Sequence, residues 1–589
     1  MNNIPKKNLM FLLYDRAIIY LILTMLLYLS MGEMFHNIQI HYIKDYALFR
    51  RWGDAMLIAF PLLFMRKKIL AFPYLLLVNV YFLSIIWYYR VYSTIMPLSS
   101  YLMVYNLDGL SLSVFRLIKF RDILVVLPSV FWCIYYCCVY RKLKCFFLSR
   151  IKIALLCLLL FGGIVVYYAC KRNPTPGYAT LNGLYTIEPV RAFKEFGIVH
   201  YWIYQIGIFQ GISEKEEQYA KNFMCSIENG SNCAKKKVEG GKNLILILVE
   251  SLHSWPIGMN IDGIEITPHI NQLLKQDKTI YFSKEMPQVK DGRSSDAQLI
   301  INTGILPLAT GAVSACYAAN TFPSLPAALK EKGYTTASFL WDDKNYWNQE
   351  AMSRAYQFEC LYDRLRDSER FEEADEQLFA KALPLLLKLP QPFYAQIVTM
   401  SSHEPWIRPP HMKTLLDGIE IKNEDVRNYM VILQYVDQCI WKFVTQLKEE
   451  GIYDNSVIVI TGDHDALPFN EYEGREELKG EDCFVPFIIL NSPLSSEHTD
   501  KVIGQVDIYP SLLDLMGCAD YSFTGLGESV FNDEISDFAT YRTGISAGGV
   551  NVSDSVKRHR EECWRLSDII LRMNYFKTNS ILAPDKNSM

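Results

Sequence analysis

The stretch NLILILVE (residues 243–250) decides the fold of the C-terminal half of this chain. It is an uninterrupted apolar run closed by a carboxylate, which is typical of a parallel strand buried on both faces. Three later stretches repeat the pattern: FYAQIVTM (393–400), SVIVITG (456–462) and CFVPFIIL (483–490). The sequence therefore predicts four buried strands of the same kind.

Helical patterns separate these strands. The clearest are PSLPAALKEKG (323–333) and residues 426–451, where Gly451 is placed to end the helix. Strands that alternate with helices are characteristic of domains with a mostly parallel sheet. We therefore expect an α/β sandwich over residues 242–550, followed by a peripheral C-terminal tail over 551–589.

Ionisable side chains stand where three of the predicted strands end. Glu250 closes the first strand, and Asp463 with His464 follows SVIVITG. His403 comes shortly after FYAQIVTM. Each of these residues alone is more often structural, but in open α/β sheets functional sites gather at the carboxyl ends of strands. The combination predicts a site for one divalent cation, and oxygen ligands with one imidazole fit Mn²⁺, Mg²⁺ or Zn²⁺.

A serine pair adds a candidate nucleophile. In DGRSSDAQLIINTG (291–304), Ser295 and Gln298 have the spacing of a capping box, which is the structural explanation of the pair. Ser294 would then lie one residue outside the helix, close to backbone N–H groups that bind phosphate well. A hydroxyl bound to a metal at this place becomes a nucleophile.

Residues 1–172 are mostly apolar, with basic residues between the apolar stretches, and this pattern predicts a transmembrane helix bundle. A spanning helix needs about 20 apolar residues. Five stretches approach this length: 17–31, 52–65, 69–89, 123–140 and 153–170. The second stretch is short and contains Pro61, so it is the weakest of the five.

Basic residues orient the bundle. Lys6 and Lys7, residues 66–68 and the basic residues of 141–152 would be cytoplasmic under the positive-inside rule. Five spans then place the C-terminal half outside, whereas four would leave it in the cytoplasm. We expect five, and hence a multi-pass protein of the cell membrane with its α/β domain on the periplasmic or extracellular side.

Residues 173–241 form a predicted linker. Within it, AFKEFGIVHYWIYQIGIFQ (192–210) is too polar to span a membrane but rich in aromatic residues. It fits an interfacial helix, with Tyr201, Trp202 and Tyr204 at headgroup level, or a helix packed on the α/β domain.

Composition disfavours some function classes. A formal net charge of −4 over 589 residues argues against nucleic-acid binding. A transporter is disfavoured because the predicted spans carry few charges apart from Asp15 and Arg16. The 14 cysteines show no zinc-type spacing. Cys225 and Cys233 are close enough in sequence to pair, and free thiols are the equal alternative.

Four separated motifs carry a family resemblance: NLILILVES, GRSSDAQ, TMSSHEPW and VITGDHD. Together with QVDIYPSLLDLMG (505–517) and GLGESVF (525–531), they resemble the lipoteichoic acid synthase-like, or phosphoglycerol transferase, branch of the alkaline phosphatase–sulfatase superfamily. That branch combines five spans with an extracellular α/β domain. The resemblance implies a bacterial cell-membrane enzyme that moves a phospholipid headgroup, glycerol phosphate foremost, to a glycan or lipid acceptor.

The resemblance also implies roles for individual residues. Glu250, Asp463 and His464 would hold one divalent cation, Mn²⁺ foremost, with Ser294 as fourth ligand and covalent nucleophile. The family's nucleophile is usually threonine, and serine keeps its hydroxyl. His403 matches a histidine that contacts the substrate phosphate or assists the leaving group.

The recognition motif departs from the family pattern. Trp347 and Asn348 match the headgroup-binding motif F-W-N-R, but Gln349 replaces its arginine and Trp341 replaces a nearby histidine. Without that cationic clamp, the donor can be phosphatidylglycerol or phosphatidylethanolamine. A phosphoethanolamine transferase is therefore the alternative activity, ahead of a sulfatase or phosphodiesterase. Residues 294–298 lack the Pro and Arg that formylglycine formation in sulfatases needs, and a catalytically dead sensor would have lost a metal position.

Overall fold

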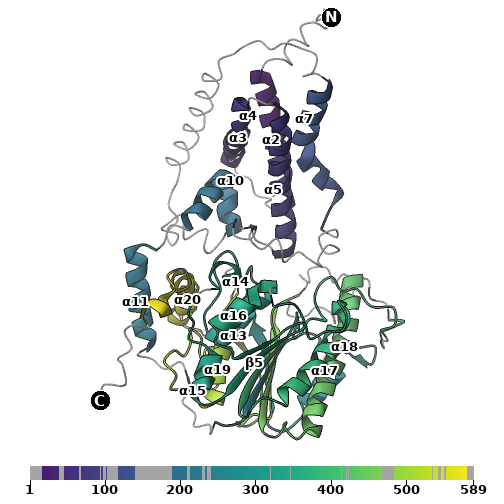
Figure 1. The fold of residues 1–589 in the computed structure, drawn as a ribbon, viewed down its shortest axis with the longest axis vertical. Helices are drawn as coiled ribbons and strands as arrows, with labels where there is room; N and C mark the ends of the chain where they lie inside the picture. The colour runs from purple at the N-terminus through teal and green to yellow at the C-terminus, as the bar shows by residue number, and fades with distance from the viewer. Residues whose placement is uncertain are drawn as a thin grey trace, which may run out of the picture. The chain divides into compact units, whose positions relative to one another are not determined.

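A computed structural model of the chain describes residues 16–38, 45–65, 68–92, 95–96, 98, 101, 117–138, 189–208, 212–228, 233–234, 240–318, 320–344, 346–412, 414, 416–419, 421, 423–466, 483–533, 535–541, 546–549 and 552–579. These residues form two compact units, one made of residues up to 208 and one of residues from 212 onward. Figure 1 shows that the first unit is helical and that the second is built around a sheet.

The N-terminal unit consists of helices that bury apolar side chains against one another. Its elements are α2 (Arg16–Asn37), α3 (Asp45–Ala59), α4 (Pro61–Phe64), η1 (Lys68–Leu70), α5 (Ala71–Tyr92), η3 (Phe120–Val126), α7 (Leu127–Cys138) and α10 (Pro189–Ile208). Within the described part of the chain, three stretches are long and apolar enough to cross a membrane: Ile19–Asn37, Ala71–Arg90 and Phe120–Cys137. Large apolar side chains exposed on them suit contact with lipid.

These three stretches coincide with the first, third and fourth predicted spans. The second, 52–65, is divided between α3 and α4 at Phe60 and is not a span candidate. Pro61 explains the division, because proline cannot continue a helix through its interior. Residues 153–170 lie outside the described residues, so the count of five spans stays a prediction.

Helix α10 belongs to the N-terminal unit. Its residues Phe193, Ile198 and Tyr201 are completely buried in the same apolar cluster as α2, α3 and α5. Trp202 donates from Nε1 to the Tyr81 hydroxyl at 2.7 Å. Tyr201 is therefore a core residue of this unit, whereas an interfacial position had placed it at headgroup level.

The N-terminal unit buries more charge than expected. Arg50, Arg51 and Asp54 on α3 are each at most 7% exposed. On α5, Arg90 forms an ion pair of 2.8 Å with Asp122. Of these charges only Asp54 lies within a predicted span, 52–65, and the others adjoin predicted spans, where composition does not reveal that α3 turns its charged face inward.

The C-terminal unit is organised around an eight-stranded sheet with the order β10-β4-β9-β8-β1-β7-β5-β6. Its strands are β1 (Asn243–Val249), β4 (Ile280–Met286), β5 (Thr335–Leu340), β6 (Cys360–Tyr362), β7 (Phe393–Val398), β8 (Ser456–Gly462), β9 (Val485–Leu490) and β10 (Glu497–Gly504). Strands β8, β1, β7, β5 and β6 run parallel. Strand β9 is antiparallel to both β8 and β4, so its predicted direction is wrong. An apolar run indicates burial on both faces, which either direction allows.

Helices cover both faces of this sheet (Figure 1). One layer contains α13 (Ser294–Thr303), α15 (Leu325–Glu331), α19 (Ile508–Leu515) and α20 (Asp554–Arg572), and the other contains α12 (Pro268–Leu273), α17 (Ala374–Leu386) and α18 (Glu424–Glu449). Side chains of β1 point alternately into the two cores between the sheet and these layers. Leu246 lies in the core of the first layer and Ile247 in the core of the second. The two predicted helices correspond to α15 and α18, and Gly451 follows α18 with a φ of 73°.

The C-terminal tail was expected to be peripheral, and this prediction is wrong. Helix α20 buries Cys563, Leu566 and Ile570 in the first core. Its Arg560 pairs with the buried Asp507 at 2.6 Å. The many charges of the segment hide this amphipathic face in a composition count.

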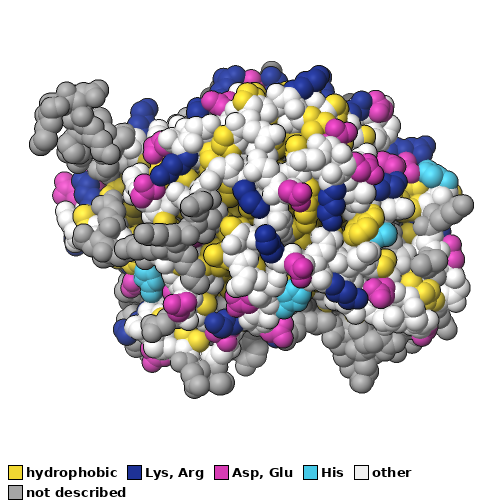
Figure 2. Space-filling view, turned by 90° about the horizontal axis from the view of Figure 1, so that it is seen from below, with side chains coloured by type: hydrophobic (Ala, Val, Ile, Leu, Met, Phe, Trp, Pro, Cys, Tyr) yellow, Lys and Arg dark blue, Asp and Glu magenta, His cyan; other side chains and the backbone are white. Residues whose placement is uncertain are grey.

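Two surface features complete the unit. Cys225 is exposed and Cys233 is buried, and the two are not bonded to each other. Figure 2 shows basic and acidic side chains interspersed on the face that it presents, so the described side chains there form no field of one sign.

Candidate active site

Three of the predicted ligands lie at the carboxyl ends of the neighbouring strands β1 and β8. Glu250 follows β1, and Asp463 with His464 follows β8. The N–H of Asp463 donates to the carbonyl of Val249 at 3.1 Å and so extends the pairing beyond the strands. Gly462 permits this approach, because a Cβ there would lie 2.2 Å from the carbonyl oxygen of Leu252.

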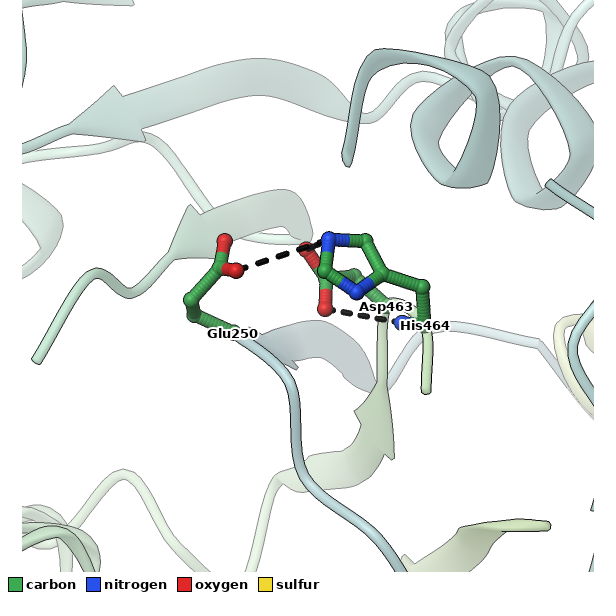
Figure 3. A group of neighbouring side chains, drawn as sticks. All are labelled: Glu250, Asp463 and His464. Carbon is green, nitrogen blue, oxygen red and sulfur yellow. Dashed lines mark hydrogen bonds and ion pairs between the residues drawn. The ribbon is translucent and has the colours of Figure 1, made fainter. Parts of the chain in front are cut away.

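The side chains converge on one point (Figure 3). The ligand atoms of Glu250, Asp463 and His464 lie within 4.8 Å of one another, and all three residues are buried. Nε2 of His464 is 3.4 Å from Oε1 of Glu250 and 3.5 Å from Oδ2 of Asp463. Ser294 completes the group, since its Oγ donates to Oε2 of Glu250 at 3.1 Å and lies 3.4 Å from Nε2 of His464.

This donor set fits a divalent cation. Oδ1 of Asp463 accepts from the N–H groups of Ser251 at 2.7 Å and His464 at 2.8 Å. Its Oδ2 is buried and has no hydrogen-bond partner among the residues that the structure describes. Such an oxygen is costly unless a cation compensates for it. Two carboxylates with one imidazole suit Mn²⁺, Mg²⁺ or Zn²⁺.

Burial sets the protonation of the group. Burial, and then the neighbouring carboxylate of Glu250, raises the pKa of Asp463 to about 7. Burial, and then the guanidinium of Arg293, lowers the pKa of His464 to about 4. The imidazole is thus neutral at pH 7, the form that binds metals. Its Nδ1 lies 2.9 Å from the carbonyl of Asp465, a partner that leaves Nε2 available to a metal.

Ser294 is the first residue of α13, and the predicted capping box is wrong. Arg293 occupies the cap position with a φ of 46° and no side-chain cap bond. The hydroxyl of Ser295 instead lies 3.0 Å from that of Ser314. The side chain of Ser295, which the local sequence pattern assigned to the helix cap, therefore takes part in a tertiary contact with Ser314 instead.

Asp296 organises the start of this helix. Its Oδ2 accepts from the N–H groups of Gly292 at 2.9 Å and Lys290 at 3.0 Å. A Cβ on Gly292 would lie 2.2 Å from Oδ1 of Asp296, so glycine is required for this turn. The loop thereby folds over the helix start and leaves Ser294 at the positive end of the helix dipole, where anions are favoured.

Two residues were missed by sequence reasoning. Arg293 donates from Nη2 to the carbonyl of Asp465 at 3.0 Å and lies 3.3 Å from Nδ1 of His464. Ser251, with a φ of 52°, donates to Oε1 of Glu250 at 2.9 Å. Both directly adjoin predicted site residues in sequence, and this adjacency was the available signal.

The predicted recognition residues lie beyond β5, in η5 (Tyr346–Asn348) and at the start of α16 (Gln349–Ala355). Trp347 and Asn348 are left-handed, with φ of 48° and 53°. Such backbone strain is typical of functional segments. Nδ2 of Asn348 donates to the carbonyl of Ser314 at 3.0 Å. Because Ser314 also contacts Ser295, a polar chain joins this segment to the residue after Ser294.

His403 and Trp341 share the sheet edge but not the four-residue group. His403 is partly buried, and its side chain contacts the carbonyl of Glu404 and, edge-on at 6.0 Å, the ring of Phe371. Trp341 is 4% exposed, and the guanidinium of Arg366 stacks over it at 4.7 Å. Both residues follow strands parallel to β1, which brings them to the same edge as Glu250.

Curated proteins with similar sequences include lipoteichoic acid synthases. Lipoteichoic acid synthase 2 of Bacillus subtilis (strain 168) is 32% identical over 320 residues, which cover 52% of this chain and 49% of the relative. Lipoteichoic acid synthase 1 of the same strain is 28% identical over 459 residues, which cover 72% and 68%. The chain thus spans about half to two thirds of the length of these relatives.

Solved structures with a similar fold include the lipoteichoic acid synthase LtaP from Listeria monocytogenes, with a TM-score of 0.48, 25% identity, and coverage of 60% of this chain and 95% of that one. The Streptococcus pyogenes phosphoglycerol transferase GacH in complex with sn-glycerol-1-phosphate gives a TM-score of 0.40 at 14% identity, with coverage of 62% and 93%. The Sulfatase family matches residues 242–518. Over these residues the chain is therefore similar to the sulfatase family, and these curated relatives carry the name lipoteichoic acid synthase.

Proposed function

We propose that this chain is a membrane-anchored, metal-dependent phosphotransferase that moves the glycerol phosphate of phosphatidylglycerol to a glycan or lipid acceptor. The observation that carries the proposal is the Ser294 hydroxyl, held at the start of α13 against Glu250 and His464. A hydroxyl beside a candidate cation site and a helix N-terminus suits attack on a phosphate ester. The names of the relatives, lipoteichoic acid synthases, support this donor and this class of acceptor.

One divalent cation, Mn²⁺ foremost, would be held by Glu250, Asp463, His464 and Ser294. When bound, it would lower the pKa of the Ser294 hydroxyl and offset the charge of the phosphate oxygens. The buried, unpartnered Oδ2 of Asp463 supports this assignment.

The transfer would take two steps. Ser294 loses its proton to solvent, and its Oγ attacks the phosphorus while the bond to the diacylglycerol oxygen breaks. His403 would give a proton to that departing oxygen. N–H groups at the start of α13, together with Arg293, offset the negative oxygens. An acceptor hydroxyl then attacks the same phosphorus, returns a proton to His403 and releases Ser294, which regains its proton from solvent.

A phosphoethanolamine transferase is the second candidate. Trp347, Asn348 and Gln349 would contact the headgroup, and Gln349 is neutral and only 8% exposed. Position 349 therefore offers no cation that could bind a phosphate, and the glycerol phosphate headgroup has no dedicated charge partner there.

The membrane arrangement is part of the proposal. Five spans over residues 1–172 would place the catalytic domain, residues 242–550, outside the bacterial cell membrane. Residues 173–241 would link the two, and α20 within 551–589 would close the catalytic core.

The test is turnover by the purified full chain with labelled phosphatidylglycerol or phosphatidylethanolamine, each with Mn²⁺, Mg²⁺ or Zn²⁺. We expect metal-dependent release of diacylglycerol from phosphatidylglycerol and none with a chelator. Preference for phosphatidylethanolamine would select the second candidate. No release from either lipid with any metal would overturn both.

A further inference from the structure

Among its described residues, the N-terminal unit contains two ion pairs between side chains of opposite charge. Arg90 pairs with Asp122 at 2.8 Å, and Arg121 pairs with Glu33 at 2.9 Å. Pairing is the normal condition for ionisable groups among membrane helices, because an isolated charge there is expensive. An unpaired charge in this unit is therefore a candidate binding site.

Asp54 is the acidic neighbour of the two arginines on α3. The contacts that its carboxylate makes account for its burial. Its Oδ2 accepts from the N–H of Ile198 at 3.0 Å, where α10 breaks at Gly197 with a φ of 85°. A Cβ on Gly197 would lie 2.2 Å from that oxygen and 2.8 Å from Nε of Arg50. Asp54 thus caps the second part of α10 and faces Arg50.

Arg51 has no such partner among the described residues. It is 7% exposed, and its Nε is buried without a hydrogen bond. The contacts of its guanidinium are aromatic, with ring centroids of Tyr28 at 5.5 Å and Phe35 at 5.0 Å. Aromatic faces attract a cation but carry no charge to neutralise it. No carboxylate of the described chain lies within ion-pair distance of Arg51.

The surroundings of Arg51 form a built cradle on α2, which packs against α3 (Figure 1). Gly32 lies between the two rings in sequence, and a Cβ on it would be 3.0 Å from Nη1 of Arg51. The absence of a side chain at Gly32 therefore leaves room for the guanidinium of Arg51. Trp52, next to Arg51, stacks on Tyr28 at 4.6 Å and fixes that wall.

We propose that Arg51 binds the phosphodiester of a phospholipid. A buried, uncompensated cation requires an anion, and the guanidinium matches phosphate oxygens in a two-pronged geometry. The helices around it carry exposed apolar side chains that suit acyl chains. A lipid supplies the phosphate and the apolar tail together, whereas a free phosphate supplies only the first. This site is separate from the proposed transfer reaction and needs neither metal nor turnover.

The test is native mass spectrometry of the full chain in detergent with chelator, titrated with phosphatidylglycerol. Inorganic phosphate and sn-glycerol phosphate form separate arms. We expect a retained phospholipid in the wild type, at least a tenfold loss of affinity in Arg51→Gln, an intermediate loss in Arg51→Lys, and no competition by the free phosphates. Arg121→Gln is the control, because that paired side chain is 58% exposed and should bind lipid as the wild type does.

The outcomes separate cleanly. Equal lipid retention by the wild type, Arg51→Gln and Arg51→Lys would overturn the proposal. Binding of inorganic phosphate as strong as that of lipid, and lost in Arg51→Gln, would overturn the assignment to lipid. If Arg51→Gln fails to fold, the ratio of Arg51→Lys to wild type decides alone, since a lysine keeps the charge but not the two-pronged geometry.

Discussion

Two sides of the candidate site are built in different ways. The cation side, Glu250, Ser294, Asp463 and His464, is held by strand ends and a helix start through short side-chain and backbone contacts. The recognition side, Trp341, Trp347, Asn348, Gln349 and His403, lies on the segments that follow β5 and β7, with η5 and the start of α16 among them, and includes two left-handed residues. The sheet thus positions the proposed reacting groups, while the segments proposed to contact the headgroup lie beyond the strand ends and can vary without disturbing the sheet. In the resemblance drawn from the sequence, the matching residues fall on the cation side and the departures fall on the recognition side, in line with this difference.

The largest expected effect tests the cation side. Ser294→Ala should lower diacylglycerol release by roughly 10⁴-fold or more, because the proposed nucleophile is gone. Ser294→Thr should keep transfer, since it retains a hydroxyl. Both are measured by turnover of labelled phosphatidylglycerol, and equal rates in Ser294→Ala and wild type would show that this hydroxyl does not react.

Metal binding should stabilise the folded chain. At a metal concentration of 100 times Kd, the gain in unfolding free energy is about 2.7 kcal/mol. Thermal unfolding with and without Mn²⁺ should show the gain in wild type and its loss in Glu250→Gln and Asp463→Asn. Asp417→Asn, whose side chain is 54% exposed, is the matched control and should behave as wild type. An unchanged metal effect in both ligand variants would contradict the assigned site.

Gln349→Arg tests the recognition side. The introduced cation should shift the ratio of kcat/KM for phosphatidylglycerol over phosphatidylethanolamine upward by roughly tenfold, which corresponds to about 1.4 kcal/mol. Metal-dependent stabilisation should not change, because the two sides are separate. An unaltered donor ratio would remove Gln349 from headgroup selection.

The smallest expected effect concerns the strained segment. Asn348→Ala should destabilise the chain by about 1–2 kcal/mol, since alanine tolerates the left-handed conformation poorly and the bond to Ser314 is lost. Asn348→Gly also loses the bond but relieves the strain, so it should cost less. Chemical unfolding of the two variants measures the difference. If both cost the same, the left-handed backbone contributes nothing.

Sequence reasoning reached the cation side because apolar runs show where buried strands end, and parallel strands bring their ends to one edge. It did not reach the start of α13, since the carboxylate of Asp296 and the contact between Ser295 and Ser314 are tertiary. The direction of β9 and the inward face of α20 could not be predicted from the sequence for the same reason.

The N-terminal unit shows the same limit. The charges of Arg51 and Asp54 are visible in the sequence, but their burial depends on how α3 packs against α2 and α10. A composition count therefore treats them as loop residues.

The most direct measurement is peptide mass spectrometry of the full chain after incubation with phosphatidylglycerol and Mn²⁺ and without acceptor. The account predicts a glycerol phosphate diester on the peptide that contains Ser294, absent from Ser294→Ala and removed when an acceptor is added. Diacylglycerol release without this modification, or a modification elsewhere that persists in Ser294→Ala, would contradict it.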